Sequence, residues 1–145
     1  MARTLRFEAL YPYLPEQVWA ALTDREAIGD WLMPNDFAPH VGHRFNFHTK
    51  PAPGFDGVVH CEVLEVEPPR RLAYSWKGGG IDTVVAYSLS AEGGNTRLVM
   101  EQSGFTGLRA WMVSRILAGG WKKIIGQNLR DAAGRVTDGQ YRGVG

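Results

Sequence analysis

The sequence predicts an α+β fold in which a curved antiparallel β-sheet wraps around one long C-terminal helix. The last third of the chain, residues 107–138, carries an apolar stripe at steps of three or four residues, the period of an amphipathic helix. Its members are Leu117, Trp121, Ile125, Leu129, Ala132 and Val136. Before Gly107 the chain reads mostly as half-buried strands. Because one helix cannot bury its own apolar stripe, the strands are expected to cover it as a second layer.

A first strand and two short helices are predicted ahead of the main run of strands. Residues 5–10 alternate apolar and polar side chains, as a strand with one buried face does. Pro15 suits the first turn of a helix, where its missing N–H is not needed. Thr23 or Asp24 can then cap a second short helix over residues 25–30. The sheet is therefore expected to receive two helices between its first and second strands.

About five more antiparallel strands are expected before the long helix, giving a sheet of about six. Residues 44–48, 72–77, 85–89 and 97–102 alternate in character, which assigns one face of each strand to the core. The residues expected on these inner faces are Phe45, Phe47, Leu72, Tyr74, Trp76, Val85, Tyr87, Leu89, Leu98, Met100 and Gln102.

Two segments do not follow this simple alternation. Residues 58–67 also predict a strand, but apolar residues occupy both parities, so its inner and outer faces cannot be assigned. Ser103 and Gly104 are expected to end the last strand, since glycine weakens a strand interior.

The long helix itself contains two features that need a reason. Gly119 and Gly120 each cost about 1 kcal/mol relative to alanine in a helix. They are expected to kink the helix, to mark its true start or to admit another backbone, unless this is an ordinary core helix with two unfavourable residues. Nearby apolar residues are expected either to pack on the sheet edge or to form a partner surface or lid, and these are Leu108, Trp111, Met112 and Ile116.

Length and composition indicate one domain, residues 1–145, with a substantial core. The formal net charge is +1 and Lys and Arg do not cluster, so nucleic-acid binding is not indicated. The single Cys61 excludes an internal disulfide and fits a reducing compartment. The sequence shows no apolar run of signal-peptide or membrane-spanning length. We therefore expect a soluble, cytoplasmic protein without membrane insertion.

Residue patterns for catalysis or metal binding are weak. Ser103 lies outside any nucleophile elbow. His40 and His43 flank a turn with Asp36 nearby, but a metal needs three or four converging ligands, so solvated turn residues are the preferred interpretation. Cys61 is expected to be a buried, inert thiol. No metal or cofactor is therefore expected.

His60 and Glu62 share one face of the strand over residues 58–67, which could place a base in a cavity. A half-exposed pair at the sheet edge is the preferred interpretation of these two residues.

A gap between the curved sheet and its helix is the expected ligand site of such a fold. Strand parity and the helix stripe predict the residues around one common cavity: Trp31, Phe45, Phe47, Tyr74, Trp76, Tyr87, Met100, Gln102, Trp121 and Ile125. Their polar groups are an amide, two phenol hydroxyls and indole N–H groups. Such a set orients a ligand but offers no obvious nucleophile or general base, so binding is favoured over catalysis.

Five blocks of the sequence, in register, resemble the Hsp90 ATPase activator homologue family. They are residues 14–24 with Trp31, residues 41–47, residues 62–76, residues 96–105 and Gly120-Trp121. The resemblance covers about residues 5–136. It implies membership of the START-like, or SRPBCC, superfamily, whose helix-grip fold encloses a deep apolar cavity. This chain departs from the pattern at Gln102, where many members have histidine, and at Cys61, where glycine is usual.

Three functions follow from the residues and the resemblance together. The preferred one is binding of a small apolar, aromatic or lipid-like ligand. The family name implies a chaperone-interaction module instead, but the N-terminal docking domain of two-domain activators is not seen in this sequence. Superfamily relatives imply a cyclase-like or aromatase-like enzyme, for which Gln102 lacks the titratable group. A homodimer is left open.

Overall fold

The computed structural model describes residues 2–143, so Met1, Val144 and Gly145 lie outside the described residues. Six strands form one antiparallel sheet in the order β1-β6-β5-β4-β3-β2. Their bounds are β1 Ala2–Tyr11, β2 Arg44–His48, β3 Val58–Glu67, β4 Arg71–Gly78, β5 Ile81–Glu92 and β6 Asn95–Thr106. The expected antiparallel sheet of about six strands is confirmed.

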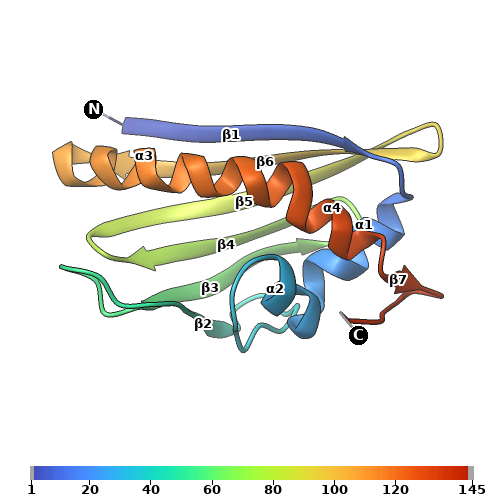
Figure 1. The fold of residues 1–145 in the computed structure, drawn as a ribbon, viewed down its shortest axis with the longest axis horizontal. Helices are drawn as coiled ribbons and strands as arrows, with labels where there is room; N and C mark the ends of the chain where they lie inside the picture. Colours follow the sequence, from blue (N-terminus) through green and yellow to red (C-terminus); the bar gives the residue numbers. More distant parts are fainter. Residues whose placement is uncertain (1, 144–145) are drawn as a thin grey trace.

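Two short helices follow the first strand, as the sequence predicts. They are α1, Pro15–Thr23, and α2, Arg25–Trp31. Of the two cap candidates, Asp24 is the one used, because its carboxylate accepts a hydrogen bond from the backbone N–H of Ala27 at 2.9 Å. Both helices lie near the C-terminal end of the long helix and close that end of the molecule (Figure 1).

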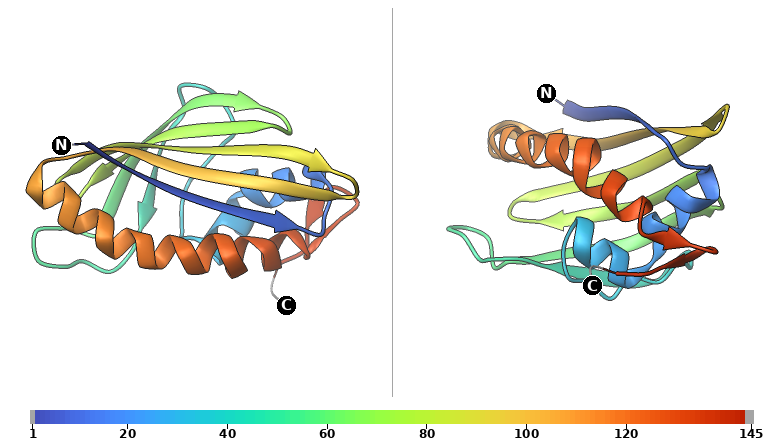
Figure 2. Two further views of the ribbon diagram at one scale, coloured as in Figure 1. Left: turned by 90° about the horizontal axis from the view of Figure 1, so that it is seen from above. Right: turned by 45° about the vertical axis from the view of Figure 1, so that its right-hand side comes forward.

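The long helix comprises α3 (Gly107–Lys123), a π-helical turn η1 (Ile124–Asn128) and α4 (Leu129–Ala133). It runs along the concave side of the curved sheet (Figure 2). The stripe residues Trp121, Ile125 and Leu129 are all buried, Leu129 in α4, which packs on α1 and α2. This arrangement, a sheet gripping one helix, is the helix-grip fold.

The helix ends earlier than the sequence suggests. It stops at Ala133, whereas the apolar stripe predicts a helix to about residue 138. Val136 still packs in the core, but from β7 (Val136–Thr137), which pairs with β8 (Gln140–Tyr141). A buried apolar residue at the right spacing therefore does not require that the helix continue.

A hydrogen bond from the first strand supports the π-helical turn. The hydroxyl of Tyr11 donates to the backbone carbonyl of Ile125 at 2.5 Å. A π-turn displaces the regular backbone ladder and leaves a carbonyl in need of a donor. Tyr11 supplies that donor from β1, so this bond fixes the helix against the sheet where its turns widen.

The inner faces of β2, β4, β5 and β6 match the predicted parity, with every expected inner residue buried. In β3 a register shift between Val63 and Glu65 explains why its faces could not be assigned. Val59, Cys61 and Val63 face the core and Leu64 is exposed, whereas after the shift Val66, of the opposite parity, packs against the core.

The expectation that Ser103 and Gly104 end the last strand is wrong. β6 continues to Thr106, and its register with β1 shifts between Arg3 and Thr4. Gly104 has φ +103°, a conformation that favours glycine, and a Cβ there would come within 3.1 Å of the Asp82 carbonyl oxygen. The glycine therefore allows a bulge and a close strand approach instead of ending the strand.

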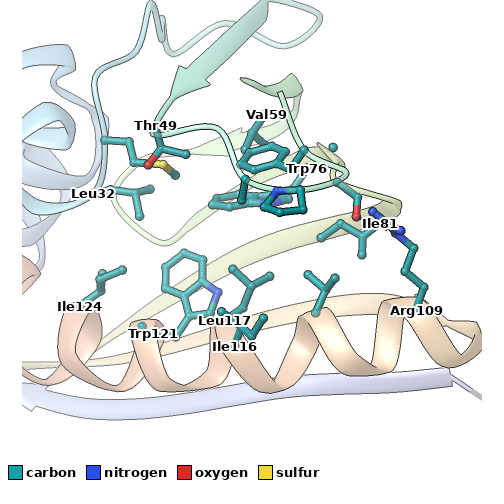
Figure 3. Close-up of a pocket in the computed structure, with 18 residues that line it drawn as sticks. Leu32, Thr49, Val59, Trp76, Ile81, Arg109, Ile116, Leu117, Trp121 and Ile124 are labelled. Atoms are coloured by element: carbon teal, nitrogen blue, oxygen red, sulfur yellow. Dashed lines mark hydrogen bonds between the residues drawn. The ribbon is translucent and has the colours of Figure 1, made fainter. Parts of the chain in front are cut away.

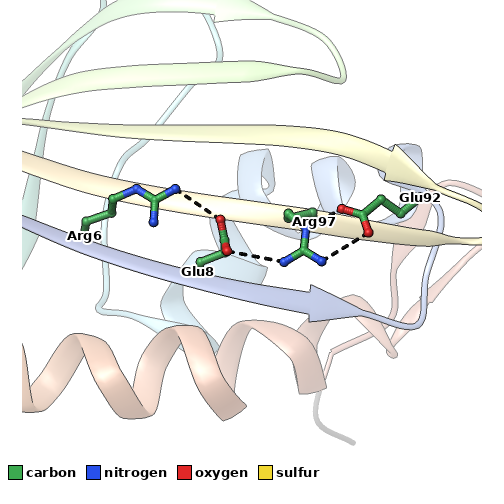
Figure 4. Close-up of polar contacts among 4 residues, drawn as sticks. All are labelled: Arg6, Glu8, Glu92 and Arg97. Atoms are coloured by element: carbon green, nitrogen blue, oxygen red, sulfur yellow. Dashed lines mark hydrogen bonds and ion pairs between the residues drawn. The ribbon is translucent and has the colours of Figure 1, made fainter.

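The outer face of the sheet carries charged side chains at the β1–β6 and β5–β6 pairs. Arg97 bonds to both Glu92 and Glu8, and Arg6 bonds to Glu8 at 3.1 Å (Figure 4). The guanidinium of Arg97 lowers the pKa of the Glu92 carboxyl. Because these groups are solvated, such pairs contribute little to folding and mainly keep this face polar.

Candidate functional site

An open apolar pocket of about 420 Å³ lies beside α3, where the helix and the β3–β4 side of the sheet diverge. The sheet contributes Val59, Trp76, Gly78 and Ile81, together with Gly79 of the β4–β5 turn. The loop between β2 and β3 contributes Thr49, Ala52, Pro53 and Phe55, and Leu32 and Met33 come from the end of α2. Figure 3 shows these groups facing the helix across the pocket.

The helix supplies one continuous wall. Its lining residues follow helical spacing and are Arg109, Val113, Ile116, Leu117, Gly120, Trp121 and Ile124. Arg109 stands at one end of this row and Ile124 at the other (Figure 3). From Arg109 to Ile124 the helix advances by fifteen residues at about 1.5 Å each, so this wall is about 22 Å long. The pocket is therefore elongated along the helix.

Gly119 and Gly120 neither begin the helix nor admit another backbone. α3 runs through both, and a Cβ built on either residue meets no atom within 4 Å. Gly120 lines the pocket, so the missing side chain leaves space there that a larger residue would occupy. Gly119 is exposed and does not line it. The same residue type thus has a consequence for the pocket at only one of the two positions.

Trp76 and Trp121 form the floor of the pocket. Their ring centroids are 5.8 Å apart with the planes inclined at 53°, and each residue is at most 4 % exposed. Apolar aromatic surface of this kind contributes strongly to burying a ligand.

A buried chain of hydrogen bonds joins the Trp121 indole to the backbone of Trp76. The Trp121 indole N–H donates to Gln102 Oε1 at 2.8 Å, and Gln102 Nε2 donates to the Thr83 hydroxyl at 2.9 Å. The Thr83 hydroxyl donates in turn to the carbonyl of Trp76 at 2.9 Å. Gln102 therefore acts as a positioning residue beneath the floor, and both its amide oxygen and its amide nitrogen have a partner within the protein.

Of the ten residues predicted from parity and the helix stripe, only Trp76 and Trp121 line this pocket. The other eight are buried: Gln102 is a buried polar residue, and seven belong to one aromatic and apolar cluster of the core, namely Trp31, Phe45, Phe47, Tyr74, Tyr87, Met100 and Ile125. The hydroxyls of Tyr74 and Tyr87 bond to each other at 2.8 Å, so the pair satisfies its own polar groups. A role in ligand contact stays a prediction for all ten.

Sequence reasoning did not find the loop wall or Arg109. Phe55 lies in a Pro- and Gly-rich loop, and no strand or helix period indicates where that loop folds. Arg109 sits at the first turn of α3, in register with Val113 and Leu117. A search for charged residues in register with the apolar side of the helix could have found it.

The apolar residues at the start of α3 do not pack on the sheet edge. Leu108 is 75 % exposed and Ile116 77 %, while Trp111 and Met112 are also exposed. Arg115 lies over the Trp111 ring at 5.3 Å. Ile116 belongs both to this exposed face and to the pocket, so the pocket opens directly onto it.

Titratable groups in the core are held in their neutral forms. Burial raises the pKa of the Cys61 thiol, which confirms the expected buried cysteine. Burial also raises the pKa of Tyr11, Tyr74 and Tyr87 above the usual value. Within residues 2–143, His, Cys, Asp and Glu side chains form no group of three suited to a metal ion.

His60 and Glu62 do not lie at the edge of the sheet, where the sequence places them. They belong to β3, an inner strand, on which His60 is exposed and Glu62 is partly buried.

A helix-grip fold of this kind, one antiparallel sheet around a long C-terminal helix, is that of a START-like domain. The chain belongs to the family described as Activator of Hsp90 ATPase homolog 1-like protein, which it matches over residues 12–134. The resemblance seen in the sequence is thereby confirmed. Helices within the described part of the chain lack the length and apolarity needed to cross a membrane.

Several solved structures are similar to this chain. Protein MLL2253 from Mesorhizobium loti is 35 % identical with a TM-score of 0.83, over 93 % of this chain and 99 % of its own. CalU16 from Micromonospora echinospora is 26 % identical with a TM-score of 0.71, over 88 % and 76 %. BH1534 from Bacillus halodurans is 25 % identical with a TM-score of 0.73, over 89 % and 95 %. Comparison with curated proteins gives no match.

Proposed function

We propose that the protein binds a small, elongated, apolar ligand in the pocket between α3 and the β2–β3 loop. The pocket volume of about 420 Å³ falls within the range of roughly 300–1,000 Å³ typical of small-molecule sites. Its walls are aliphatic and aromatic, and the polar groups beneath its floor are satisfied by one another. Such a wall favours apolar surface over water.

The observation that carries this proposal is Gly120. A helix interior disfavours glycine by about 1 kcal/mol, and neither a turn nor a close backbone contact requires one here. What the glycine does is leave open the part of the pocket beside Trp121. A helix that served only to fill the core would gain stability from a side chain at this position.

Binding is favoured over catalysis by the residues that line the pocket. Among the described lining residues, Arg109 is the one side chain that carries charge, and none is a histidine, cysteine or carboxylic acid. General acid–base chemistry needs a group whose pKa lies near the working pH. The lining residues supply no such group, which supports a ligand-binding role.

The matched variants Gly120→Leu and Gly119→Leu test the proposal. Both remove a helix glycine where a Cβ meets no neighbour, so both are expected to raise stability by about 0.8 kcal/mol, or about 2–4 °C in Tm. Only Gly120→Leu places a side chain in the pocket. Calorimetric titration with decan-1-ol should therefore show binding by the native chain and by Gly119→Leu, and at least tenfold weaker binding by Gly120→Leu.

Two results would count against the proposal. Absence of decan-1-ol binding by the native chain would remove the apolar site. Equal affinity of the two leucine variants would place the bound alcohol elsewhere on the protein, because only one of them fills the pocket.

A further inference from the structure

We infer that the ligand carries an anionic group at one end, a carboxylate or a chemically equivalent oxyanion, and that Arg109 binds it. This inference rests on the proposed function, since it names the chemical class of ligand for the same pocket. The observations behind it are the position, contacts and surroundings of the Arg109 guanidinium.

Arg109 is the charged exception in an apolar wall. It occupies the mouth end of the helix row, whereas Trp121 and Ile124 lie at the far end (Figure 3). From Arg109 to Trp121 the helix rises about 18 Å. A molecule with a long apolar body and a charge at one end matches this distribution.

The guanidinium has hydrogen-bonding capacity left for a ligand. Its Nε donates to the carbonyl of Gly79 at 3.3 Å and Nη2 donates to the carbonyl of Gly54 at 3.1 Å. Arginine has five N–H donors, so these two bonds leave several N–H groups for another acceptor. The Gly54 bond is at the long end of the usual range for such bonds and the Gly79 bond is slightly longer than that range.

No carboxylate of the described residues lies within 4.0 Å of the Arg109 nitrogens. Arg6, Arg44, Arg70, Arg71, Arg97 and Arg130, by contrast, each pair with an acid. Carboxylates and phosphates match the planar guanidinium fork and form its strongest hydrogen bonds.

Two glycines make room for this side chain. A Cβ at Gly54 would lie 2.4 Å from Nη2, and one at Gly80 would lie 2.2 Å from Nε. Both residues have positive φ, as glycine readily adopts. The β2–β3 loop and the β4–β5 turn therefore converge on Arg109 and hold its guanidinium at the pocket mouth.

Decanoate and decan-1-ol form the test pair, because they share a ten-carbon chain and differ in the charge of the end group. The native chain should bind decanoate about tenfold or more tightly than decan-1-ol. Arg109→Gln should abolish this preference by weakening decanoate binding much more than decan-1-ol binding, and Arg109→Lys should keep part of it, since lysine retains the charge without the fork. The control Arg115→Gln changes an exposed arginine of the same helix that does not line the pocket, so the preference should persist.

The outcomes separate this inference from the proposed function. If the native chain binds decan-1-ol as tightly as decanoate, the anionic class is wrong and the apolar pocket stands. If Arg109→Gln weakens both probes equally, Arg109 only holds the mouth together and the inference is overturned. If neither probe binds the native chain, both the inference and the proposed function fail.

Discussion

Replacing Gln102 by leucine should destabilise the protein through its partner Trp121. Gln102 is fully buried and joins the Trp121 indole to Thr83 through bonds of 2.8 and 2.9 Å. Leucine has a similar size but accepts no hydrogen bond. The variant therefore leaves the indole N–H of a residue that is 2 % exposed without an acceptor.

The magnitude follows from these two bonds. A buried donor left without a partner costs about 1–3 kcal/mol, and the second bond contributes about 1 kcal/mol. Added apolar burial by leucine offsets part of this cost. We expect a loss of about 2–3 kcal/mol in the free energy of unfolding, or roughly 5–10 °C in Tm for a chain of 145 residues.

A double-mutant cycle isolates the contact. Trp121→Phe removes the indole N–H, so the double variant Gln102→Leu/Trp121→Phe contains neither partner. Urea unfolding followed by circular dichroism should show the double variant about 1–2 kcal/mol more stable than the sum of the single losses predicts. Gln127→Leu, at an exposed position of η1, should stay within about 0.5 kcal/mol of the native chain. Strict additivity in the cycle would refute the proposed role of Gln102.

Two further predictions concern the core and the surface. Because burial raises the pKa of Tyr11, Tyr74 and Tyr87, the unfolded chain releases protons above about pH 10 that the folded chain retains. The contribution of these tyrosines to the free energy of unfolding should therefore be constant below that pH and fall above it, by up to about 1.4 kcal/mol per pH unit for each tyrosine, and a flat profile in urea unfolding between pH 9 and 11 would contradict the burial argument. The second prediction is that the purified chain alone does not raise ATP turnover by an Hsp90-type chaperone. Its exposed apolar face on α3 is small beside the roughly 20–30 residues per side of a stable protein interface. Saturable stimulation in an ATPase assay would count against this prediction.

Much of the fold could be predicted because its signals are local. Alternation placed Phe45 and Phe47 on one face, and the 3.6-residue period placed Trp121 and Ile125 against the sheet. The register shift in β3 could not be predicted, because it arises from pairing with β4 and not from any residue pattern within the strand. The end of the helix was missed for a related reason, since Val136 is buried from a different element.

The candidate site was less accessible to sequence reasoning. Parity shows which side chains face inward, but it does not show where inward side chains pack together and where they leave space. Tyr74 and Tyr87 fill the core by bonding to each other, whereas Trp76 and Trp121 remain at the edge of open space. The pocket is completed by a loop whose course depends on contacts such as those of Gly54 with Arg109, separated by 55 positions in the chain.

The most direct test of ligand binding in this pocket is a crystal structure grown with 10-bromodecanoate, whose bromine marks the end of the apolar chain by anomalous scattering. The account predicts a bromine peak within about 4 Å of Trp76 or Trp121, the normal distance of apolar contact, with the carboxylate beside Arg109. A peak on the exposed face of Leu108 and Met112, or an empty pocket at saturating ligand, would contradict it.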